Sequence, residues 1–265
     1  MIKLIASDMD GTLLNSDKNL NPEFHSLLKQ LKSKGIIFVA VSGRDMNSLK
    51  RVFKDIDEDI ILASNNGNFI TYKGEVIFKN SIEKNNLGKI RKIIRKTAKH
   101  STIYCGKEKI YSESFIPVIM GRRYKLKVDV VKDITDIKDE IIKVTTIGNK
   151  SILQKSLKKL DNLKNELMIT MSGPQCFDIC KLGGTKEQGI KILQDKFSIN
   201  YDETMVFGDH LNDLEMMQSA YYSFAMQNAR DEVKEKSRFI AKTNDENGVV
   251  DAIKKVVFEN EVTVV

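Results

Sequence analysis

Cysteine is scarce in this chain, and its scarcity excludes a fold stapled by disulfides. The 265 residues include three cysteines, Cys105, Cys176 and Cys180, an odd number in a chain of moderate length. Disulfide-rich domains are short and carry paired cysteines, and the spacing of Cys176 and Cys180 is not that of a CxxC redox or metal pair. We interpret all three as thiols that are buried or half-buried in the fold.

Long apolar runs are also absent, which excludes a protein that crosses a membrane by helices. No stretch approaches the roughly 20 uninterrupted apolar residues that a transmembrane helix needs. The N-terminus enters an apolar strand directly, without the basic and then apolar segments of a secretion signal. With 41% apolar residues, the chain is predicted to be globular, soluble and cytoplasmic, with one large domain or two of ordinary size.

Acidic residues are fewer than basic ones, which raises the question of a nucleic-acid partner. The formal net charge is +7, and the densest basic run is KIRKIIRKTAKH at residues 89–100. There Ile90, Ile93 and Ile94 repeat at helical spacing, which is typical of an amphipathic helix with a solvated basic face. We therefore expect neither a nucleic-acid nor a membrane partner. A positive surface can instead steer small anionic substrates.

Strands and helices alternate in the first third of the chain. Apolar runs at residues 3–7, 36–41 and 60–63 predict strands, and the continuous β-branched run IIFVAV is typical of a parallel strand buried on both faces. A helix is predicted from Pro22 to Lys34, with Asn21 as its N-cap, and a second helix over 45–54. The alternation returns after Thr185, with helices at 185–197, from about Leu211 and at 248–257, and strands at 204–207 and 221–226. The pattern predicts an α/β fold, a Rossmann-like core with a parallel sheet.

The pattern changes between these two halves. FITY and EVIF on either side of Lys73-Gly74 predict a hairpin over 69–78, and after a helix at 84–99 come short strands separated by turn residues. We therefore predict three segments. Residues 1–82 form the first part of the core, 83–182 an inserted α+β domain, and 183–265 the second part of the core.

Polar clusters follow four predicted core strands, at the point where each strand ends. Asp8 and Asp10 follow the first strand, Ser42-Gly43-Arg44 the second, Asn66-Gly67 the third, and the run GDHLND at 208–213 follows TMVF. Turn chemistry explains any one cluster by itself. In open parallel sheets, however, ligands bind outside the carboxyl ends of the strands, so four such clusters together predict one site.

Carboxylates dominate this predicted site, and they favour a hard cation bound through oxygen. Mg²⁺ fits such a site better than zinc. With the ion present, Asp8 and Asp209 can both stay ionised. Asp10 need not bind the ion through its side chain, so its carboxyl group is available for proton transfer.

The motifs resemble those of the haloacid dehalogenase superfamily in order, strand context and spacing. DMDGTLL is similar to the first motif, DxDGT after the first strand. SGR is similar to the second, Lys186 in GGTKEQGI to the third, and GDHLNDLEMM to the fourth. NNGN at 65–68, AMQNAR at 225–230 and NDENGVVDAI at 244–253 further resemble the Cof-type subgroup. That subgroup carries an inserted C2-type cap domain between the second and third motifs.

The resemblance implies an Mg²⁺-dependent phosphatase of small phosphorylated metabolites, such as sugar phosphates. Asp8 would be the nucleophile and form an aspartyl-phosphate. Asp10 would protonate the leaving group and later deprotonate the water. The implied catalytic residues are Asp8, Asp10, Ser42 and Lys186. The implied metal ligands are Asp8, Asp10 through its backbone carbonyl, Asp209 and Asp213. The alternative role of Asp213 is to orient Lys186. The implied substrate or phosphate contacts are Met9 through the backbone amides that follow it, Ser42, Gly43, Lys186 and Asn212.

Some positions and functions remain open. Arg44 is interpreted as a surface arginine that opens a helix rather than as a catalytic residue. In the inserted domain, candidates for facing the substrate are Asp178 and the run Arg122-Arg123-Tyr124-Lys125. Alternative functions are a phosphomutase or phosphotransferase of sugar phosphates, or a regulatory or nucleic-acid-binding protein on the same scaffold.

Overall fold

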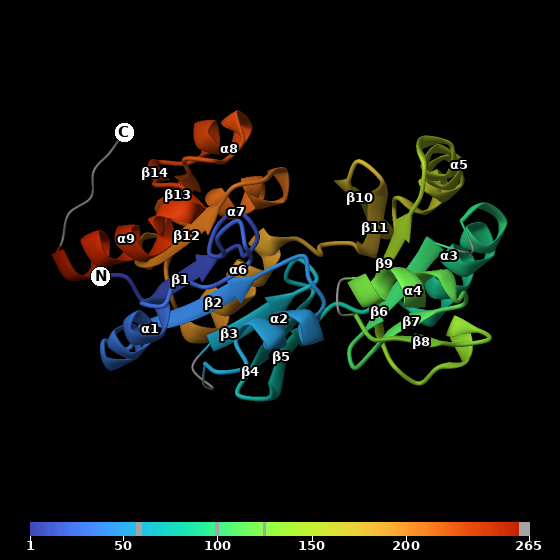
Figure 1. The fold of residues 1–265 in the computed structure, drawn as a ribbon, viewed down its shortest axis with the longest axis horizontal. Helices are drawn as coiled ribbons and strands as arrows, with labels where there is room; N and C mark the ends of the chain where they lie inside the picture. Colours follow the sequence, from blue (N-terminus) through green and yellow to red (C-terminus); the bar gives the residue numbers. More distant parts are fainter. Residues whose placement is uncertain (57–59, 99–100, 124–125, 260–265) are drawn as a thin grey trace. The chain divides into compact units, whose positions relative to one another are not determined.

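The computed structural model describes residues 1–265 apart from 57–59, 99–100, 124–125 and 260–265, and the chain divides into two compact units (Figure 1). The first unit, called the core below, comprises Met1–Phe78 and Thr185–Val265. The second, called the inserted unit, comprises Lys79–Gly184, and the predicted segment 83–182 falls within it. The core is therefore assembled from both ends of the chain.

One eight-stranded sheet forms the centre of the core. Its strand order is β14-β13-β12-β1-β2-β3-β4-β5. Neighbours from β14 to β3 pair in parallel, and β4 pairs with β3 in the antiparallel sense. The strands are β1 (Leu4–Ser7), β2 (Ile37–Val41), β3 (Ile60–Ser64), β4 (Phe69–Tyr72), β5 (Glu75–Lys79), β12 (Thr204–Gly208), β13 (Tyr222–Met226) and β14 (Phe239–Ala241). The predicted α/β fold with a parallel sheet is confirmed.

The central strands are apolar because both of their faces are covered. Every residue of β1 and β12 is buried, as is every residue of β2 after Ile37. Parallel strands occur almost only with helices on both faces, which explains the continuous apolar runs. The hairpin of β4 and β5 turns at Lys73 and Gly74, with φ values of 51° and 82°. Two successive positive φ values are typical of the tight turns that join hairpin strands.

Helices α1 (Phe24–Ser33), α2 (Met46–Val52), α6 (Lys186–Phe197), α7 (Leu214–Met217), α8 (Asp231–Lys236) and α9 (Gly248–Lys254) belong to the core. The first begins two residues later than predicted, because the Asn21 side chain accepts the N–H of Glu23 at 2.7 Å in a local turn. The prediction missed α8 and β14, which are too short to show a clear period.

The inserted unit has its own sheet and its own apolar core. The strand order is β10-β11-β9-β6-β7-β8, with β6 (Thr102–Gly106), β7 (Ile110–Ser112), β8 (Val128–Val130), β9 (Ile141–Ile147), β10 (Leu167–Gly173) and β11 (Cys176–Lys181). Its helices are α3 (Lys84–Thr97), α4 (Ile116–Arg123) and α5 (Lys150–Leu160). The expectation of only short strands after residue 99 is wrong, since it missed α4 and α5. The predicted end of the first helix, residue 99, lies outside the described residues.

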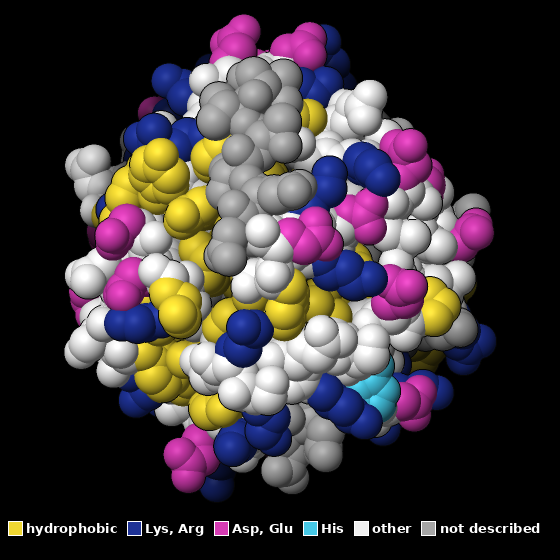
Figure 2. All heavy atoms as spheres, turned by 90° about the vertical axis from the view of Figure 1, so that its left-hand side faces the viewer, with side chains coloured by type: hydrophobic (Ala, Val, Ile, Leu, Met, Phe, Trp, Pro, Cys, Tyr) yellow, Lys and Arg dark blue, Asp and Glu magenta, His cyan; other side chains and the backbone are white. Residues whose placement is uncertain are grey.

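Within the described ranges, no helix combines the length and apolar character needed to span a membrane. On the face shown in Figure 2, Lys and Arg side chains are interspersed with Asp and Glu. The excess of positive charge is therefore not gathered into one basic patch on this face.

Candidate active site

The polar loops predicted to meet do follow neighbouring strands of the core sheet. In the strand register, Ser7 at the end of β1 lies beside Phe207 of β12 and Ala40 of β2. Asp8 follows β1 directly, and its backbone N–H donates to the Phe207 carbonyl at 3.0 Å. The chain segments after β1, β2, β3 and β12 thus leave the sheet at one edge, as expected for parallel strands.

A buried lysine joins two of the predicted acids. Lys186, the first residue of α6, has a side chain that is 1% exposed. Its Nζ donates to Asp8 Oδ1 at 2.5 Å and to Asp213 Oδ1 at 2.6 Å. Burial alone would lower the pKa of Lys186, but the charges of Asp213 and Asp8 outweigh burial and raise it. The lysine therefore stays cationic beside Asp8.

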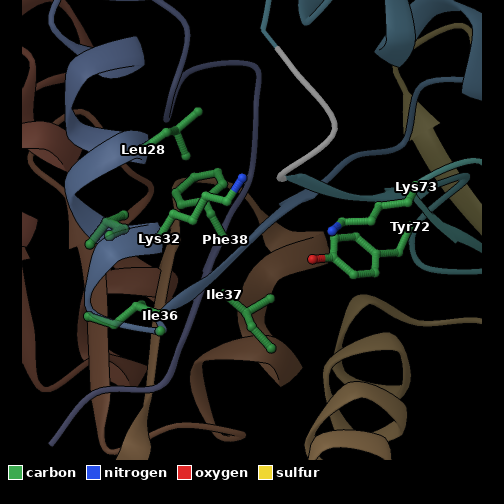
Figure 3. A pocket seen from close by; sticks show the side chains of 9 residues that line it. Leu28, Lys32, Ile36, Ile37, Phe38, Tyr72 and Lys73 are labelled. Carbon is green, nitrogen blue, oxygen red and sulfur yellow. The ribbon is translucent and has the colours of Figure 1, made fainter.

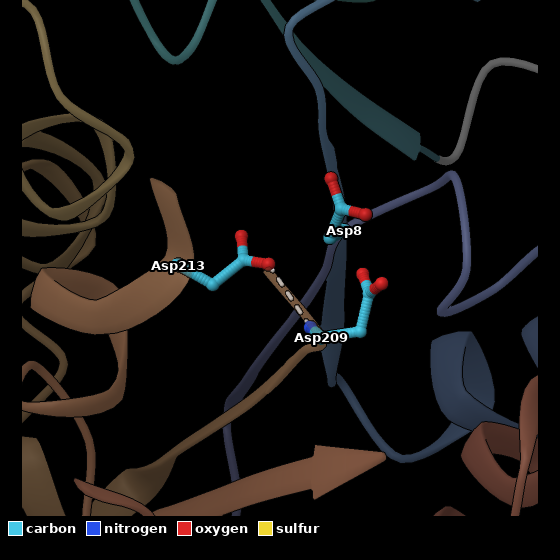
Figure 4. A group of neighbouring side chains, drawn as sticks. All are labelled: Asp8, Asp209 and Asp213. Atoms are coloured by element: carbon cyan, nitrogen blue, oxygen red, sulfur yellow. Dashed lines mark hydrogen bonds between the residues drawn. The ribbon is translucent and has the colours of Figure 1, made fainter. Parts of the chain in front are cut away.

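Asp209 brings a third carboxyl group to this place. Oxygen atoms of Asp8, Asp209 and Asp213 lie within 4.8 Å of one another. Figure 4 shows Asp8 and Asp209 just beyond the strands that they follow, β1 and β12, and Asp213 on the helical segment after β12. Thr12 Oγ1 donates to Asp209 Oδ1 at 2.9 Å. A Cβ on Gly11, whose φ is 85°, would lie 2.5 Å from Asp209 Oδ2, so glycine alone fits the loop there. We call these three residues the acidic group.

The electrostatics of the acidic group fit a bound hard cation. Burial raises the pKa of Asp8 to about 7, although Lys186 lowers it. Burial also raises the pKa of Asp209, and the negative charge of Asp213 adds to the effect. Crowded carboxylates of this kind are relieved by a divalent ion with oxygen ligands, so the residues present fit Mg²⁺.

Asp213 has a different set of partners from the other two acids. Its Oδ2 accepts the backbone N–H groups of Asp209 and His210, both at 3.0 Å, and its Oδ1 accepts from Lys186. Both of its oxygens are therefore engaged by the protein. Asp213 holds the loop after β12 and Lys186 in place, whereas Asp8 and Asp209 retain more freedom to bind an ion.

Asp10 stands apart from the acidic group. Arg44 Nε donates to Asp10 Oδ2 at 2.7 Å and Arg44 Nη2 to Oδ1 at 2.6 Å, while Lys18 Nζ lies 3.1 Å from Oδ1. Partial burial would raise the pKa of Asp10, but the bonds from Arg44, and secondarily those from Lys18, lower it. Arg44 is partly exposed and lies just before α2, as interpreted, and its guanidinium group is held against Asp10.

The loops after β2 and β3 are tied to each other and to the loop after β12. Ser42 is buried, and its carbonyl accepts the N–H of Asn66 at 2.8 Å. Asn212 Nδ2 donates to Asn66 Oδ1 at 3.3 Å, and a Cβ on Gly43 would lie 3.2 Å from that same oxygen. Met9 is wholly buried and packs in the apolar core. Asn66, whose role the motifs did not indicate, therefore connects the loop after β2 with the loop after β12.

The candidates in the inserted unit have other surroundings. Asp178 is buried, with Oδ2 3.1 Å from Lys143 Nζ and Oδ1 accepting from Thr145 Oγ1 at 2.6 Å. It therefore forms an ion pair across β9 and β11. Arg122 is exposed at the end of α4. Tyr124 and Lys125 lie outside the described residues, as does the Arg123 side chain.

A pocket in the core lies away from the acidic group. Figure 3 shows it at the amino end of β2, and its volume is about 160 Å³. It is lined by Leu28, Leu31, Lys32, Gly35, Ile36, Ile37, Phe38, Tyr72 and Lys73. Because the predicted site is at the carboxyl ends of the strands, this pocket is not part of it.

Comparisons with known proteins match this arrangement. The family model for haloacid dehalogenase-like hydrolases matches residues 5–253. The 5-amino-6-(5-phospho-D-ribitylamino)uracil phosphatase YbjI of Escherichia coli K12 is 30% identical over 260 residues, covering 96% of both chains. YcsE of Bacillus subtilis 168, which has the same descriptive name, is 28% identical over 262 residues, covering 96% of this chain and 95% of its own. A solved haloacid dehalogenase-like hydrolase from Bacteroides thetaiotaomicron has a TM-score of 0.88 at 26% identity, covering 97% of this chain and 100% of its own.

An α/β core with an inserted unit and an acid-rich site at the carboxyl ends of its strands defines a class of hydrolases. The chain belongs to the haloacid dehalogenase-like hydrolase family, and the resemblance seen in its motifs is confirmed. Within that family it is a phosphatase, as its curated relatives are.

Proposed function

We propose that this protein is an Mg²⁺-dependent phosphatase that hydrolyses small phosphorylated metabolites through an aspartyl-phosphate on Asp8. The observation that carries the proposal is the position of Asp8. It follows the central strand β1, contacts the buried Lys186 and shares the acidic group with Asp209 and Asp213. A carboxylate activated as a nucleophile needs neighbouring positive charge when its target is an anionic phosphoryl group.

Two residues would hold the cation by their side chains. Asp8 and Asp209 are proposed as ligands, with the backbone carbonyl of Asp10, while Asp213 keeps Lys186 and the loop after β12 in place. When bound, Mg²⁺ supplies the positive charge that lets an anionic nucleophile approach an anionic phosphoryl group.

The remaining residues would handle the phosphoryl oxygens and the proton. Lys186 donates from the buried side, and Ser42, Gly43 and Asn212 come from loops that Asn66 ties together. Preorganised donors of this kind stabilise the charge on the equatorial oxygens in the transition state. We assign to Asp10 the transfer of the proton to the leaving group and from the water.

The substrate is proposed to be a phosphomonoester of a small polyol or sugar. The Escherichia coli and Bacillus subtilis relatives are named for 5-amino-6-(5-phospho-D-ribitylamino)uracil, in which phosphate is joined to a ribityl chain. This compound and a panel of sugar phosphates should be incubated with the protein and Mg²⁺, with release of inorganic phosphate as the readout. Conversion to an isomeric sugar phosphate in place of phosphate release would indicate a phosphomutase.

Asp8→Asn tests the proposed nucleophile. The amide is a poor nucleophile, so we expect phosphate release to fall by at least about 10⁴-fold while the fold is retained. EDTA should abolish wild-type activity, and added Mg²⁺ should restore it. Mass spectrometry of acid-quenched wild-type protein should show a phosphoryl adduct that is absent from the variant. An Asp8→Asn protein with wild-type turnover would contradict the proposal.

A further inference from the structure

Arg44 holds the Asp10 carboxyl group by two parallel hydrogen bonds. Its Nε and Nη2 donate to separate oxygens, at 2.7 Å and 2.6 Å. This paired geometry matches the planar guanidinium fork and fixes the direction of the carboxyl plane as well as its distance. A lysine at the same place would supply charge without that orientation.

The backbone of Arg44 is itself anchored to two strand ends. Its N–H donates to Ser42 Oγ at 3.2 Å, and its carbonyl accepts the N–H of Asn65 at 2.8 Å. Asp45 follows directly as the N-cap of α2, accepting the N–H of Ser48 at 3.1 Å. The Arg44 side chain is 26% exposed. Because the Arg44 backbone is held at both its N–H and its carbonyl, its side chain can hold Asp10 at a fixed position relative to the ends of the strands.

The contacts on the two Asp10 oxygens are unequal. Oδ1 accepts from Arg44 Nη2 and is also 3.1 Å from Lys18 Nζ, whereas Oδ2 accepts from Arg44 Nε. A carboxylate oxygen offers two lone-pair directions. Among the described residues, contacts occupy both lone-pair directions of Oδ1 but only one of the two directions of Oδ2.

We propose that Arg44 is a positioning residue that orients Asp10 so that Oδ2 exchanges the catalytic proton. The proposal rests on the proposed function. In the first half-reaction an Asp8 oxygen bonds to phosphorus, the bond from phosphorus to the leaving oxygen breaks, and that oxygen takes the proton of Asp10. In the second, a water oxygen bonds to phosphorus, the bond to Asp8 breaks, and Asp10 takes a proton from the water.

The leaving group distinguishes this role from a general structural one. An alkoxide is a strong base and needs the proton as it departs, whereas p-nitrophenolate is stable as an anion and needs little help. Loss of the orientation of Asp10 should therefore affect alkyl phosphates selectively. The parameter to compare is kcat/KM, because it reports steps up to the first phosphoryl transfer and not the later hydrolysis.

The experiment compares Arg44→Gln with wild type on p-nitrophenyl phosphate and on the best alkyl phosphate of the panel. We expect kcat/KM to fall by about 100-fold for the alkyl phosphate and by less than about threefold for p-nitrophenyl phosphate. The matched control is Arg51→Gln, which removes an exposed arginine of α2 whose Nη2 donates to Ser48. It should leave both values unchanged. Equal losses on both substrates for Arg44→Gln, or no loss, would overturn the proposal.

A double variant tests whether Arg44 acts through Asp10. In an Asp10→Asn background, Arg44→Gln should cost no further kcat/KM, because the residue it orients no longer transfers a proton. A full additional loss would overturn the proposal and indicate that Arg44 contacts the phosphate itself. If circular dichroism shows that Arg44→Gln is misfolded, Arg44→Lys replaces it, and a Lys variant with wild-type leaving-group dependence would equally overturn the proposal. Wild-type protein that releases phosphate from neither substrate would instead contradict the proposed function.

Discussion

At the scale of single residues, Asp8 and Asp10 show how two acids so close in sequence acquire different properties. Asp8 is buried beside Lys186 and other acids, and burial raises its pKa to about 7. Asp10 is held by Arg44 and Lys18, which lower its pKa despite partial burial. A nucleophile must be ionised and a general acid protonated, so these directions are opposite to those that the proposed roles need, and Asp8 requires a bound cation to stay ionised.

The raised pKa of Asp8 predicts that Mg²⁺ stabilises the protein more at pH 8 than at pH 5.5. The pKa of Asp8 is about 7 in the fold against an ordinary 3.8, so between these values the folded state binds more protons than the unfolded state. Stability from this group therefore falls as the pH rises through that range, and is lowest above pH 7. An ion bound at Asp8 must displace the proton at pH 5.5, which weakens binding by about 30-fold.

Thermal unfolding with and without Mg²⁺ at the two pH values measures this effect. The control is Asp8→Asn, which has no proton to lose at this position. In this variant Mg²⁺ should raise the midpoint temperature of unfolding only slightly, and by a similar amount at both pH values. If Mg²⁺ raises the midpoint temperature of the wild-type protein equally at pH 5.5 and pH 8, then the ion and a proton do not compete for Asp8.

The sequence predicted which residues lie in the site better than it predicted the contacts between their side chains. Strand order alone brings Asp8 and Asp209 to one sheet edge, because parallel strands end together. The bond between Arg44 and Asp10 depends on side-chain rotamers across 34 positions of sequence, and no periodic pattern encodes it. The pair Lys143 and Asp178 was missed for the same reason. A polar residue in a strand is expected to face solvent unless its partner on the next strand is known.

At the scale of secondary-structure elements, the start of α6 determines where Lys186 lies. Thr185 is the N-cap, and its side chain accepts the N–H of Gln188 at 3.1 Å. The loop after β3 packs against this point, since a Cβ on Gly67, with φ of 82°, would lie 2.9 Å from the Thr185 carbonyl oxygen. The cap thus fixes the first helical residue, which is the buried lysine.

Thr185→Ala is predicted to destabilise the core by about 1 kcal/mol, because the Gln188 N–H loses its acceptor. Urea unfolding monitored by circular dichroism measures the change. Thr185→Ser keeps a hydroxyl acceptor and should cost only a few tenths of a kcal/mol. If the Ala and Ser variants are equally stable, the cap bond contributes nothing to the helix.

Elements with a long, regular pattern were predicted and short ones were not. The buried strands of the core follow from continuous apolar runs, and the turn at Lys73 and Gly74 follows from its residues. Helix α4 was missed because its buried positions are Pro117 and Gly121, while Ile119 is exposed. Eight residues that include a proline and a glycine give too weak a pattern to predict a helix.

At the scale of the whole molecule, the chain has two apolar cores rather than one. The core unit buries one cluster around β1, β2 and β12, and the inserted unit buries another around α3, α5 and its own sheet. The acidic group comes only from the core, through Asp8, Asp209 and Asp213. Binding of an ion and the packing of the inserted unit therefore depend on different residues.

This separation predicts that Phe177→Ala destabilises the inserted unit and leaves the core intact. Phe177 is wholly buried in β11, and removing such a ring costs about 3 to 5 kcal/mol through lost burial and the cavity left behind. Amide hydrogen exchange should become faster throughout residues 79–184 while the amides of β1 and β12 keep their protection. Added Mg²⁺ should slow exchange in β1 and β12 only. Faster exchange in both units of Phe177→Ala would show that the two cores unfold together and that the insertion is part of one cooperative fold.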